Sequence, residues 1–486
     1  MYGKDINDPN SYIEQAHVAF EYAARYGSNA SVNSSLLSVD PTLLWTGEPI
    51  NVVKKGLGLI SYIECDNERD KWWKGVKAYQ NCYQYAANLS AFYDGNKNTM
   101  GPGVGVKNAD PNMQVVIGGL CSGDPTYVHG MVQWCIEHRG YKADGTVNLC
   151  WDVINYHFYS NDGVSGGNAS VGVAPELSST MSLAQGYLKI AHQYANDQPV
   201  WVTESGYDLN PGSPQRAPAI GSKTAQQVEG DWILRTSLLY ARAGIQRVFF
   251  YEAQDDNPTV SIQYASSGLL NPDQTRRPAT DYLYQTNKLF GNFNYVKTLN
   301  SNPIVDQYQD AGQQMYMLVV PDQVGRTATY SLNMGSADSA YVYNPKIGSN
   351  DMTVNKVKLS GGTLSVNVTE TPTFVVPSGS TALALNVVKT ATALTTNAAT
   401  SLNTINVYPN PTAKLATVAF TNTSTSPVTI KVTDVNMNKT YKTYSFAKNG
   451  ESFSNTIDVS NVPMGVCIIQ VLQGDQSIMR KVIKTM

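Results

Sequence analysis

Two glutamates follow apolar runs that read as buried strands, where carboxyl groups can do chemistry. Glu68 ends the stretch "LISYIECDNE" (59–68), and Glu204 ends "PVWVTE" (199–204). Two carboxyl groups held about 5 Å apart can cleave a glycosidic bond, one as acid/base and the other as nucleophile. Glu64 precedes Glu68 by an even number of residues in the same run, so we expect it on the same side, where it would need a partner. The pattern predicts a sugar site if the fold brings Glu68 and Glu204 together.

Three ring-bearing residues lie at the end of another apolar run, "CWDVINYHFY" (150–159), and could orient or polarise the glutamates. They are Tyr156, His157 and Tyr159, and we expect His157 and Tyr159 at the substrate. A histidine at such a position can also be structural, held by hydrogen bonds alone.

Aromatic and acidic side chains continue beyond two of these runs. Trp72 and Trp73 either stack on sugar rings or pack the loop beneath the site. Tyr251 and Glu252 follow the last run, and we expect both to contact substrate. The carboxylates there either bind substrate hydroxyls or form a solvated loop; they are Glu252, Asp255 and Asp256.

A regular alternation of strands and helices must position these residues. Strand-like runs lie near residues 60, 115, 152, 200 and 248. Amphipathic, helix-like stretches cover about 11–26, 80–94, 126–140, 183–194, 222–243 and 278–290. Alternation with apolar strands predicts a parallel sheet covered by helices. Glu68 and Glu204 are three strand–helix units apart, so in a closed (β/α)₈ barrel they can face each other across its mouth.

The remainder of the chain predicts three further segments. Residues 1–290 would form the α/β domain, and 291–385 alternate in short runs typical of an antiparallel β-domain. Residues 386–404 are rich in Thr, Ala and Asn and predict a linker. Residues 405–486 predict a small β-sandwich.

Composition excludes several classes of function. The formal charge is −3 with 15% charged residues, so nothing indicates binding to nucleic acid or an anionic membrane. No apolar run of about 18 residues predicts a membrane span. The 6 cysteines have no CxxC spacing, so we expect no metal, and the chemistry above requires no cofactor.

Residues 58–290 resemble the clan A retaining glycoside hydrolases, a (β/α)₈ superfamily. The resemblance rests on Asn67-Glu68 after one strand and Glu204 after a later one. It implies that Glu68 is the acid/base, that Glu204 is the nucleophile, and that Asn67 donates to the substrate 2-hydroxyl. Tyr159 or His157 resembles the residue that hydrogen-bonds the nucleophile.

Two features depart from that family. Its strand eight usually ends in Trp, so here Tyr251 or Glu252 must serve. Glu68 would end strand four, yet residues 1–57 offer one good helix and no place for strands one to three. The expected fold is therefore an incomplete barrel, with strands four to eight present. Five strands would leave two open sheet edges, so we expect this chain alone to be poorly stable or inactive.

The C-terminal segment resembles the sorting domain of the type IX secretion system of Bacteroidetes. The matching stretches are "INVYPNPT", "IDVSNVPMGVCIIQV" and the basic ending "MRKVIKTM". The resemblance implies a secreted or surface-attached protein that engages the secretion machinery. Since the N-terminus shows no signal peptide, we expect that signal in a missing N-terminal part.

Together these features predict a secreted retaining glycoside hydrolase that degrades a polysaccharide or oligosaccharide, here as an N-terminally truncated chain. The alternative is a non-catalytic surface carbohydrate-binding protein on a degenerate barrel. Sugar binding without turnover would favour the alternative.

Overall fold

The computed structural model of the chain divides into two compact units, Met1–Trp134 with Leu149–Val388 and Cys135–Asn148 with Lys389–Met486. The residues that the structure describes are 5–43, 45, 47–163, 169–255, 261–378, 405–408, 412–434, 439–474 and 476–484. The predicted linker at 386–404 and the predicted contact residue Asp256 lie outside them.

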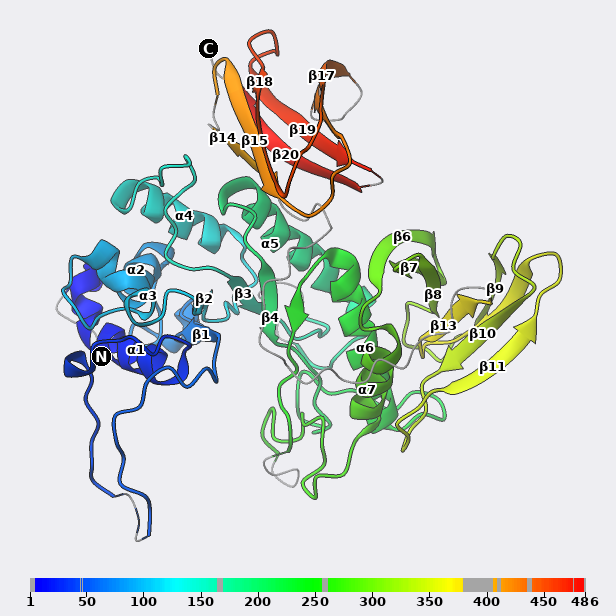
Figure 1. Ribbon diagram of the computed structural model, residues 1–486. Helices are drawn as coiled ribbons and strands as arrows, with labels where there is room; N and C mark the ends of the chain where they lie inside the picture. Colours follow the sequence, from blue (N-terminus) through cyan, green and yellow to red (C-terminus); the bar gives the residue numbers. More distant parts are fainter. Residues whose placement is uncertain are drawn as a thin grey trace. The chain divides into compact units, whose positions relative to one another are not determined.

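Five parallel strands form the framework of the first unit (Figure 1). They are β1 (Tyr62–Cys65), β2 (Gln114–Ile117), β3 (Ile154–His157), β4 (Val200–Glu204) and β5 (Arg247–Val248). β1 pairs with β2, and β3, β4 and β5 pair in that order. Parallel bridges join Val116 to Val153 and Leu120 to Tyr156, so β2 lies beside β3. The five strands are therefore found in the predicted order.

Helices alternate with these strands, as the amphipathic stretches predict. They are α1 (Ile13–Tyr26), α2 (Cys82–Asn98), α3 (Val106–Ala109), α4 (Thr126–His138), α5 (Thr180–Tyr194), α6 (Ala225–Ala243) and α7 (Pro278–Phe290). Short 3₁₀ helices cover Pro9–Tyr12, Ser34–Leu36, Trp72–Lys74 and Pro175–Leu177. Local sequence explains the ends of α6: a capping box of Thr224 and Gln227 begins it, and Gly244, at a φ of 96°, ends it.

The three central strands β2, β3 and β4 are largely buried, whereas β1 and β5 are mostly exposed or half-buried. Val115, Val116 and Ile117 of β2 are fully buried, which accounts for the unbroken apolar run in the sequence. The rings of Tyr156 on β3 and Tyr187 on α5 stack 4.3 Å apart at an interplanar angle of 6°. This packing fixes the sheet beneath the helices, so the strand ends are well-supported positions for functional side chains.

The two outer strands of this framework approach each other through their side chains. Within the described residues, β1 and β5 each have one hydrogen-bonded neighbour. The Arg247 guanidinium lies 4.7 Å from the ring centroid of Tyr62 and 4.5 Å from that of Trp201. A cation between two aromatic faces is attracted to both. Contacts between β1, β4 and β5 therefore link the outer strands.

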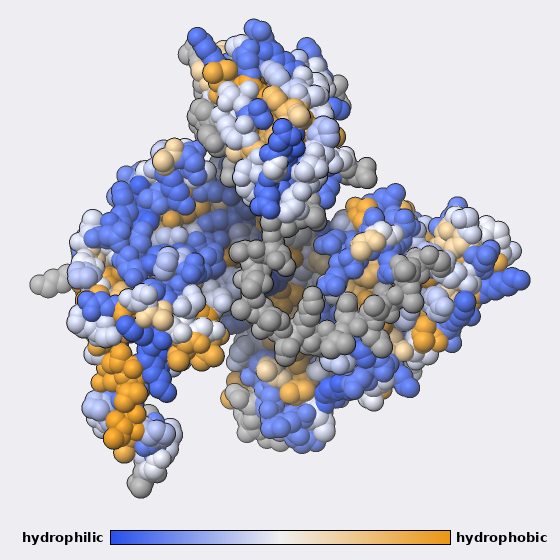
Figure 2. All heavy atoms as spheres, in the orientation of Figure 1, coloured by the Kyte–Doolittle hydropathy of each residue, from blue (hydrophilic) through white to orange (hydrophobic). Residues whose placement is uncertain are grey.

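A projecting segment precedes β1. The described residues between about 40 and 55 project from the α1 region, and the chain then returns, since the N–H groups of Gly56 and Leu59 donate to carbonyl groups of α1. Exposed apolar side chains of the projecting part include Trp45, Ile50 and Val52, at 63%, 67% and 51% exposure. Figure 2 shows much of this segment in the hydrophobic colour. None of the predicted site residues lies on it.

The first unit continues into antiparallel strands, as predicted for the region after α7. The strands are β6 (Asn294–Ser301), β7 (Ile304–Asp310), β8 (Gln313–Val319), β9 (Ala328–Asn333), β10 (Ser339–Asn344), β11 (Thr353–Lys358), β12 (Thr363–Val368) and β13 (Thr373–Pro377). Six of them form a sheet in the order β11-β10-β13-β8-β7-β6, and β12 pairs with β9. Leu234 and Leu238 of α6 pack against Tyr308 and Met315 of this sheet, so it covers one side of the α/β part.

The second unit is rich in β-strands. They are β14 (Asn406–Tyr408), β15 (Leu415–Thr421), β16 (Val428–Thr433), β17 (Thr440–Phe446), β18 (Ser452–Asp458), β19 (Gly465–Gln473) and β20 (Gln476–Lys484). They form two antiparallel sheets, ordered β14-β15-β18 and β17-β16-β19-β20. Val418 and Phe453 of one sheet share a buried core with Ile430 and Ile469 of the other. A β-rich C-terminal region is thus confirmed. Across the described residues, no helix combines the length and apolarity needed to cross a membrane.

Candidate active site

Glu68 lies in the loop after β1 rather than at a strand end. β1 ends at Cys65, and Glu68 adopts a φ of 53°, so the expectation that it continues the strand is wrong. Gly118 explains the path of this loop, because a Cβ there would lie 2.5 Å from the Cys65 carbonyl oxygen and 2.3 Å from that of Asp66. Close approach of the next strand therefore turns the chain and directs Glu68 inward, where it is only 7% exposed.

Asp70 ties this loop to the one after β2. Its carboxylate is buried and accepts hydrogen bonds from the backbone N–H groups of Cys121, at 3.0 Å, and Ser122, at 2.7 Å. A buried carboxylate with two backbone donors is a strong anchor, since each bond is charge-assisted. The loop that carries Glu68 is thus fixed from both ends.

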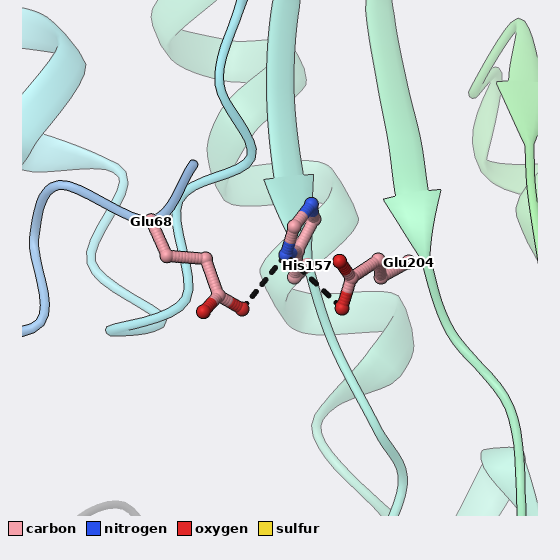
Figure 3. A group of neighbouring side chains, drawn as sticks. All are labelled: Glu68, His157 and Glu204. Carbon is pink, nitrogen blue, oxygen red and sulfur yellow. Dashed lines mark hydrogen bonds and ion pairs between the residues drawn. The ribbon is translucent and has the colours of Figure 1, made fainter. Parts of the chain in front are cut away.

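His157 ends β3 and lies between the two predicted carboxylates (Figure 3). Its Nδ1 lies 2.8 Å from Glu68 Oε1 and 3.5 Å from Glu204 Oε2, and its Nε2 lies 3.1 Å from Thr203 Oγ1. Gly119 makes room for the ring, because a Cβ there would lie 1.8 Å from His157 Nε2. The histidine therefore joins both glutamates in one hydrogen-bonded group.

Burial favours the neutral form of the His157 ring. Burial lowers its pKa below the ordinary 6.5, although the Glu204 and Glu64 carboxylates act in the opposite direction. A neutral ring carries one proton, and the carboxylate beside Nδ1 can only accept. We therefore assign that proton to Nδ1, which donates to Glu68, while Nε2 accepts from the Thr203 hydroxyl.

Glu204 is the last residue of β4, as predicted. Its backbone carbonyl accepts from the N–H of Phe158 at 3.0 Å, which extends the pairing with β3 beyond His157. The Tyr159 hydroxyl donates to Glu204 Oε2 at 3.0 Å. Burial, and then the Glu204 charge, raise the pKa of Tyr159, so this phenol keeps its proton and remains a donor.

The two carboxylates are close. One carboxylate oxygen of Glu68, one ring nitrogen of His157 and one carboxylate oxygen of Glu204 all lie within 4.8 Å of one another. Lys71, three residues after Glu68, also forms an ion pair with Glu68 Oε2. Glu68 thus has a neutral donor on one oxygen and a cation on the other, whereas Glu204 faces neutral donors.

Glu64 lies next to this group. The Asn155 amide donates to Glu64 Oε1 at 3.2 Å and to Thr203 Oγ1 at 2.6 Å, which supplies the partner that Glu64 was expected to need. Partial desolvation raises the pKa of Glu64, and the Glu204 charge adds to this. Glu64 therefore lies near Glu68 and Glu204 as expected, although Glu68 lies beyond the strand that carries Glu64.

The structure brings other predicted residues together less closely. Asn67 is exposed beside Glu68, and Trp72 and Trp73 are 68% and 49% exposed with their ring centroids 5.8 Å apart. The two tryptophans do not pack the loop from beneath, which leaves their faces open to a ligand.

Tyr251 and Glu252 follow β5, and Tyr251 is exposed. Its ring lies 5.8 Å from that of Tyr264, which in turn lies 5.2 Å from that of Tyr159. Tyr251 therefore belongs to an aromatic group beside Glu204.

Two residues named from sequence have other roles. Tyr156 is buried against α5, so it does not orient the glutamates. Asp255 is buried in an ion pair with Arg277, not in a solvated loop.

Three residues of this region were missed from the sequence, namely Lys71, Thr203 and Tyr264. Lys71 and Thr203 are each next to or near a predicted glutamate, so their proximity was an available signal. Tyr264 lies 60 positions after Glu204, counting 264 − 204, and no local pattern marks it.

The donor set of Glu68, His157 and Glu204 is also one that could ligate a metal ion. The Lys71 ammonium already neutralises Glu68, and the Nδ1 proton of His157 occupies the nitrogen that faces both carboxylates. These contacts already occupy Glu68 and the His157 nitrogen that a metal ion would need.

The C-terminal segment belongs to a recognised family of export signals. Residues 406–485 match the secretion system C-terminal sorting domain. This domain directs export through type IX secretion to the cell surface or the outside. The predicted localisation is confirmed. No curated protein matches the chain.

Solved structures that are similar to the chain include glycoside hydrolases of families 39, 30 and 44. A family 39 glycoside hydrolase from Bacteroides cellulosilyticus WH2 is 17% identical with a TM-score of 0.45, covering 65% of this chain and 57% of that one. A GH30 endoxylanase from Clostridium papyrosolvens C71 is 15% identical, with a TM-score of 0.40 and 66% of each chain covered. A family 44 xyloglucanase from Paenibacillus polymyxa is 11% identical, with a TM-score of 0.42 and 67% of each covered. The chain thus spans from 57% to 67% of the length of these structures.

Proposed function

We propose that the chain carries the active site of a secreted retaining glycoside hydrolase that acts on a polysaccharide or oligosaccharide. The observation that carries the proposal is the distance between the two carboxylates, whose nearest oxygens lie within 4.8 Å around a neutral His157. Retaining enzymes hold the two groups about 5 Å apart, whereas inverting enzymes separate them further to admit a water molecule. In this proposal β1 to β5 occupy the places of strands four to eight of a (β/α)₈ barrel.

The reaction would proceed in two displacements. Glu204 attacks the anomeric carbon while Glu68 donates a proton to the leaving oxygen, so the glycosidic bond breaks and a glycosyl ester forms on Glu204. Glu68, now ionised, removes a proton from water, and the resulting attack releases the sugar and restores both carboxyl groups. Tyr159 would orient Glu204, and His157 would hold Glu68 through its Nδ1 proton.

Substrate contacts follow from the surrounding side chains. Asn67 beside Glu68 would donate to a sugar hydroxyl. Trp72, Trp73 and Tyr251 expose ring faces that suit the apolar face of a pyranose, and Glu252 would accept from hydroxyl groups. The export signal is consistent with a substrate outside the cell.

A 2-fluoroglycoside tests this proposal in the natural protein that contains the sequence. Such a reagent forms a glycosyl ester that hydrolyses slowly, and peptide mass spectrometry then identifies the labelled residue. We expect the label on Glu204, none in Glu204→Gln, and retained labelling in Glu64→Gln. A label on another carboxylate would overturn the assignment of the nucleophile.

A second candidate is a non-catalytic carbohydrate-binding protein. The ion pair of Lys71 with Glu68 favours it, because a cation beside the carboxylate disfavours the protonated acid that the first step requires. Sugar binding that survives Glu204→Gln, together with no labelling and no turnover in the wild type, would support this candidate.

A further inference from the structure

A loop residue far from Glu204 in sequence packs on the tyrosine that contacts it. Tyr264 lies in the loop after β5, with its ring centroid 5.2 Å from that of Tyr159 at an interplanar angle of 54°. Tyr159 donates to Glu204 at 3.0 Å. Tyr264 is therefore one contact away from the proposed nucleophile.

The backbone at Tyr264 is held in an unusual conformation. Its φ of 73° lies in the left-handed region, which an aromatic residue rarely adopts. The buried carboxylate of Asp208 accepts from the Tyr264 N–H at 2.8 Å and from the Ser266 hydroxyl at 2.6 Å. Asp208 follows β4 by four residues, counting 208 − 204, so the same strand that carries Glu204 anchors this loop.

The ring of Tyr264 also meets Tyr251. These two rings lie 5.8 Å apart at 87°, an edge-to-face arrangement that aromatic pairs prefer. Tyr159, Tyr251 and Tyr264 thus form a tyrosine cluster in which Tyr264 touches both of the others. Loss of its ring would leave Tyr159 free to rotate away from Glu204.

We propose that Tyr264 is a positioning residue, whose ring keeps the Tyr159 hydroxyl on Glu204. This inference rests on the proposed function for its effect on turnover, but the contact itself can be tested without it. Asp208 fixes the backbone, Tyr264 fixes the Tyr159 ring, and Tyr159 fixes the carboxylate.

Kinetics provide the first test. With an aryl glycoside, we expect Tyr264→Leu to lower kcat on the order of 10²-fold with little change in KM, because misplacing a reacting group by about 1 Å has an effect of that size. Tyr264→Phe keeps the ring and should retain wild-type kcat. Tyr341→Leu on β10 removes another half-buried tyrosine and serves as the control. Should Tyr264→Leu not fold, Tyr264→Met replaces it.

Nuclear magnetic resonance provides a second test that needs no turnover. In protein labelled with ¹³C at tyrosine Cζ, the Tyr159 signal is assigned by its loss in Tyr159→Phe. Glu204→Gln should shift this signal in the wild-type background and in Tyr264→Phe. In Tyr264→Leu the same change should leave the signal where it is, since the two groups are no longer in contact.

The two tests separate the possible failures. Equal coupling of Tyr159 to Glu204 with and without the Tyr264 ring would overturn the proposal, as would a rise in KM alone, which would make Tyr264 a substrate contact. A wild type that neither turns over nor is labelled would instead refute the proposed function, and the Tyr159 signal would still decide the role of Tyr264.

Discussion

The loop after β1 and the end of β4 each present one glutamate to His157, but they hold it by different means. Glu204 belongs to a strand, and its backbone carbonyl accepts from Phe158 at 3.0 Å. Glu68 lies three residues beyond its strand, at a φ of 53°, in a loop fixed by Asp70. Sheet pairing positions the first, whereas the second is positioned by Asp70 of its own loop, which accepts from backbone N–H groups of the loop after β2.

The charge around the two glutamates differs as well. Glu68 is nearly buried between His157 and the Lys71 ammonium, while the Glu204 side chain is 26% exposed and accepts from Tyr159. The fixed donor on Glu204 suits a nucleophile, which needs one orientation toward one atom. The Lys71 ammonium favours the ionised form of Glu68, so the general-acid role requires that Glu68 take up a proton against this charge.

Removing either carboxylate should have the largest effect on turnover, and the two removals should differ in kind. Glu68→Gln should lower kcat by about 10²–10⁴-fold for a substrate with a poor leaving group, the usual contribution of general acid catalysis, and much less for an activated aryl glycoside. Glu204→Gln should abolish turnover of both substrates, since no covalent intermediate can form. The rates of both variants with the two substrates distinguish the roles. If Glu204→Gln were the variant that retains activity on the activated aryl glycoside, Glu204 would be the acid/base and Glu68 the nucleophile.

Displacing His157 should disturb Glu68 and Glu204 together, because the ring contacts both. Gly119→Ala would place a methyl group 1.8 Å from His157 Nε2, so the ring must move. We expect a loss of kcat/KM on the order of 10²-fold and a destabilisation of about 1–3 kcal/mol from overpacking. Urea unfolding and kinetics measure the two effects.

Gly212→Ala is the matched control for this change. The nearest atoms to a Cβ there lie at 3.6 Å, so the methyl group is accommodated. An active, fully stable Gly119→Ala protein would show that the ring does not require its observed place.

Neutralising Lys71 should act directly on Glu68, and the same charge also lowers the pKa of His157. Lys71→Met removes the cation that favours the ionised carboxylate, so the alkaline limb of the pH–activity profile should move to higher pH. The cost to stability should stay below about 1 kcal/mol because the lysine is partly exposed. Lys74→Met, an exposed change in the same loop, should leave the profile unchanged. A shift of the acid limb instead would place the lysine's effect on Glu204.

The protonation of His157 should appear as a pH dependence of stability. Because burial lowers its pKa below 6.5, the unfolded chain takes up a proton that the folded chain does not as the pH falls below that value. The free energy of unfolding should therefore fall with decreasing pH, by up to about 1.4 kcal/mol per pH unit from this group, down to the lowered pKa.

Urea unfolding on both sides of pH 6.5 measures this dependence. His157→Asn should make it shallower. Parallel curves for the wild type and the variant would mean that the folded state binds the proton after all.

The strands and helices of the α/β part could be predicted from sequence because the signals that specify them lie within the elements or at their ends. The apolar runs give β2 and β4, and the capping box at Thr224 with the glycine at 244 gives α6. Glu204 is predictable because it continues such a run.

The position of Glu68 is not predictable in this way. Its loop turns because Gly118, about fifty residues later, lies against the carbonyl groups of Cys65 and Asp66. Tyr264 reaches the site through Asp208 and a left-handed backbone, neither of which has a mark in nearby sequence. Long-range packing sets the positions of Glu68 and Tyr264, and the spacing of apolar residues along the chain gives no information about such packing.

The stereochemistry of the first product tests the central claim most directly. ¹H nuclear magnetic resonance follows the anomeric proton of the sugar released from a glycan before mutarotation scrambles it. Retention of configuration is the expected result, because carboxylate oxygens within 4.8 Å leave no space for a water molecule between nucleophile and sugar. Inversion would contradict the assignment of Glu204 as a nucleophile and of Glu68 as its acid/base.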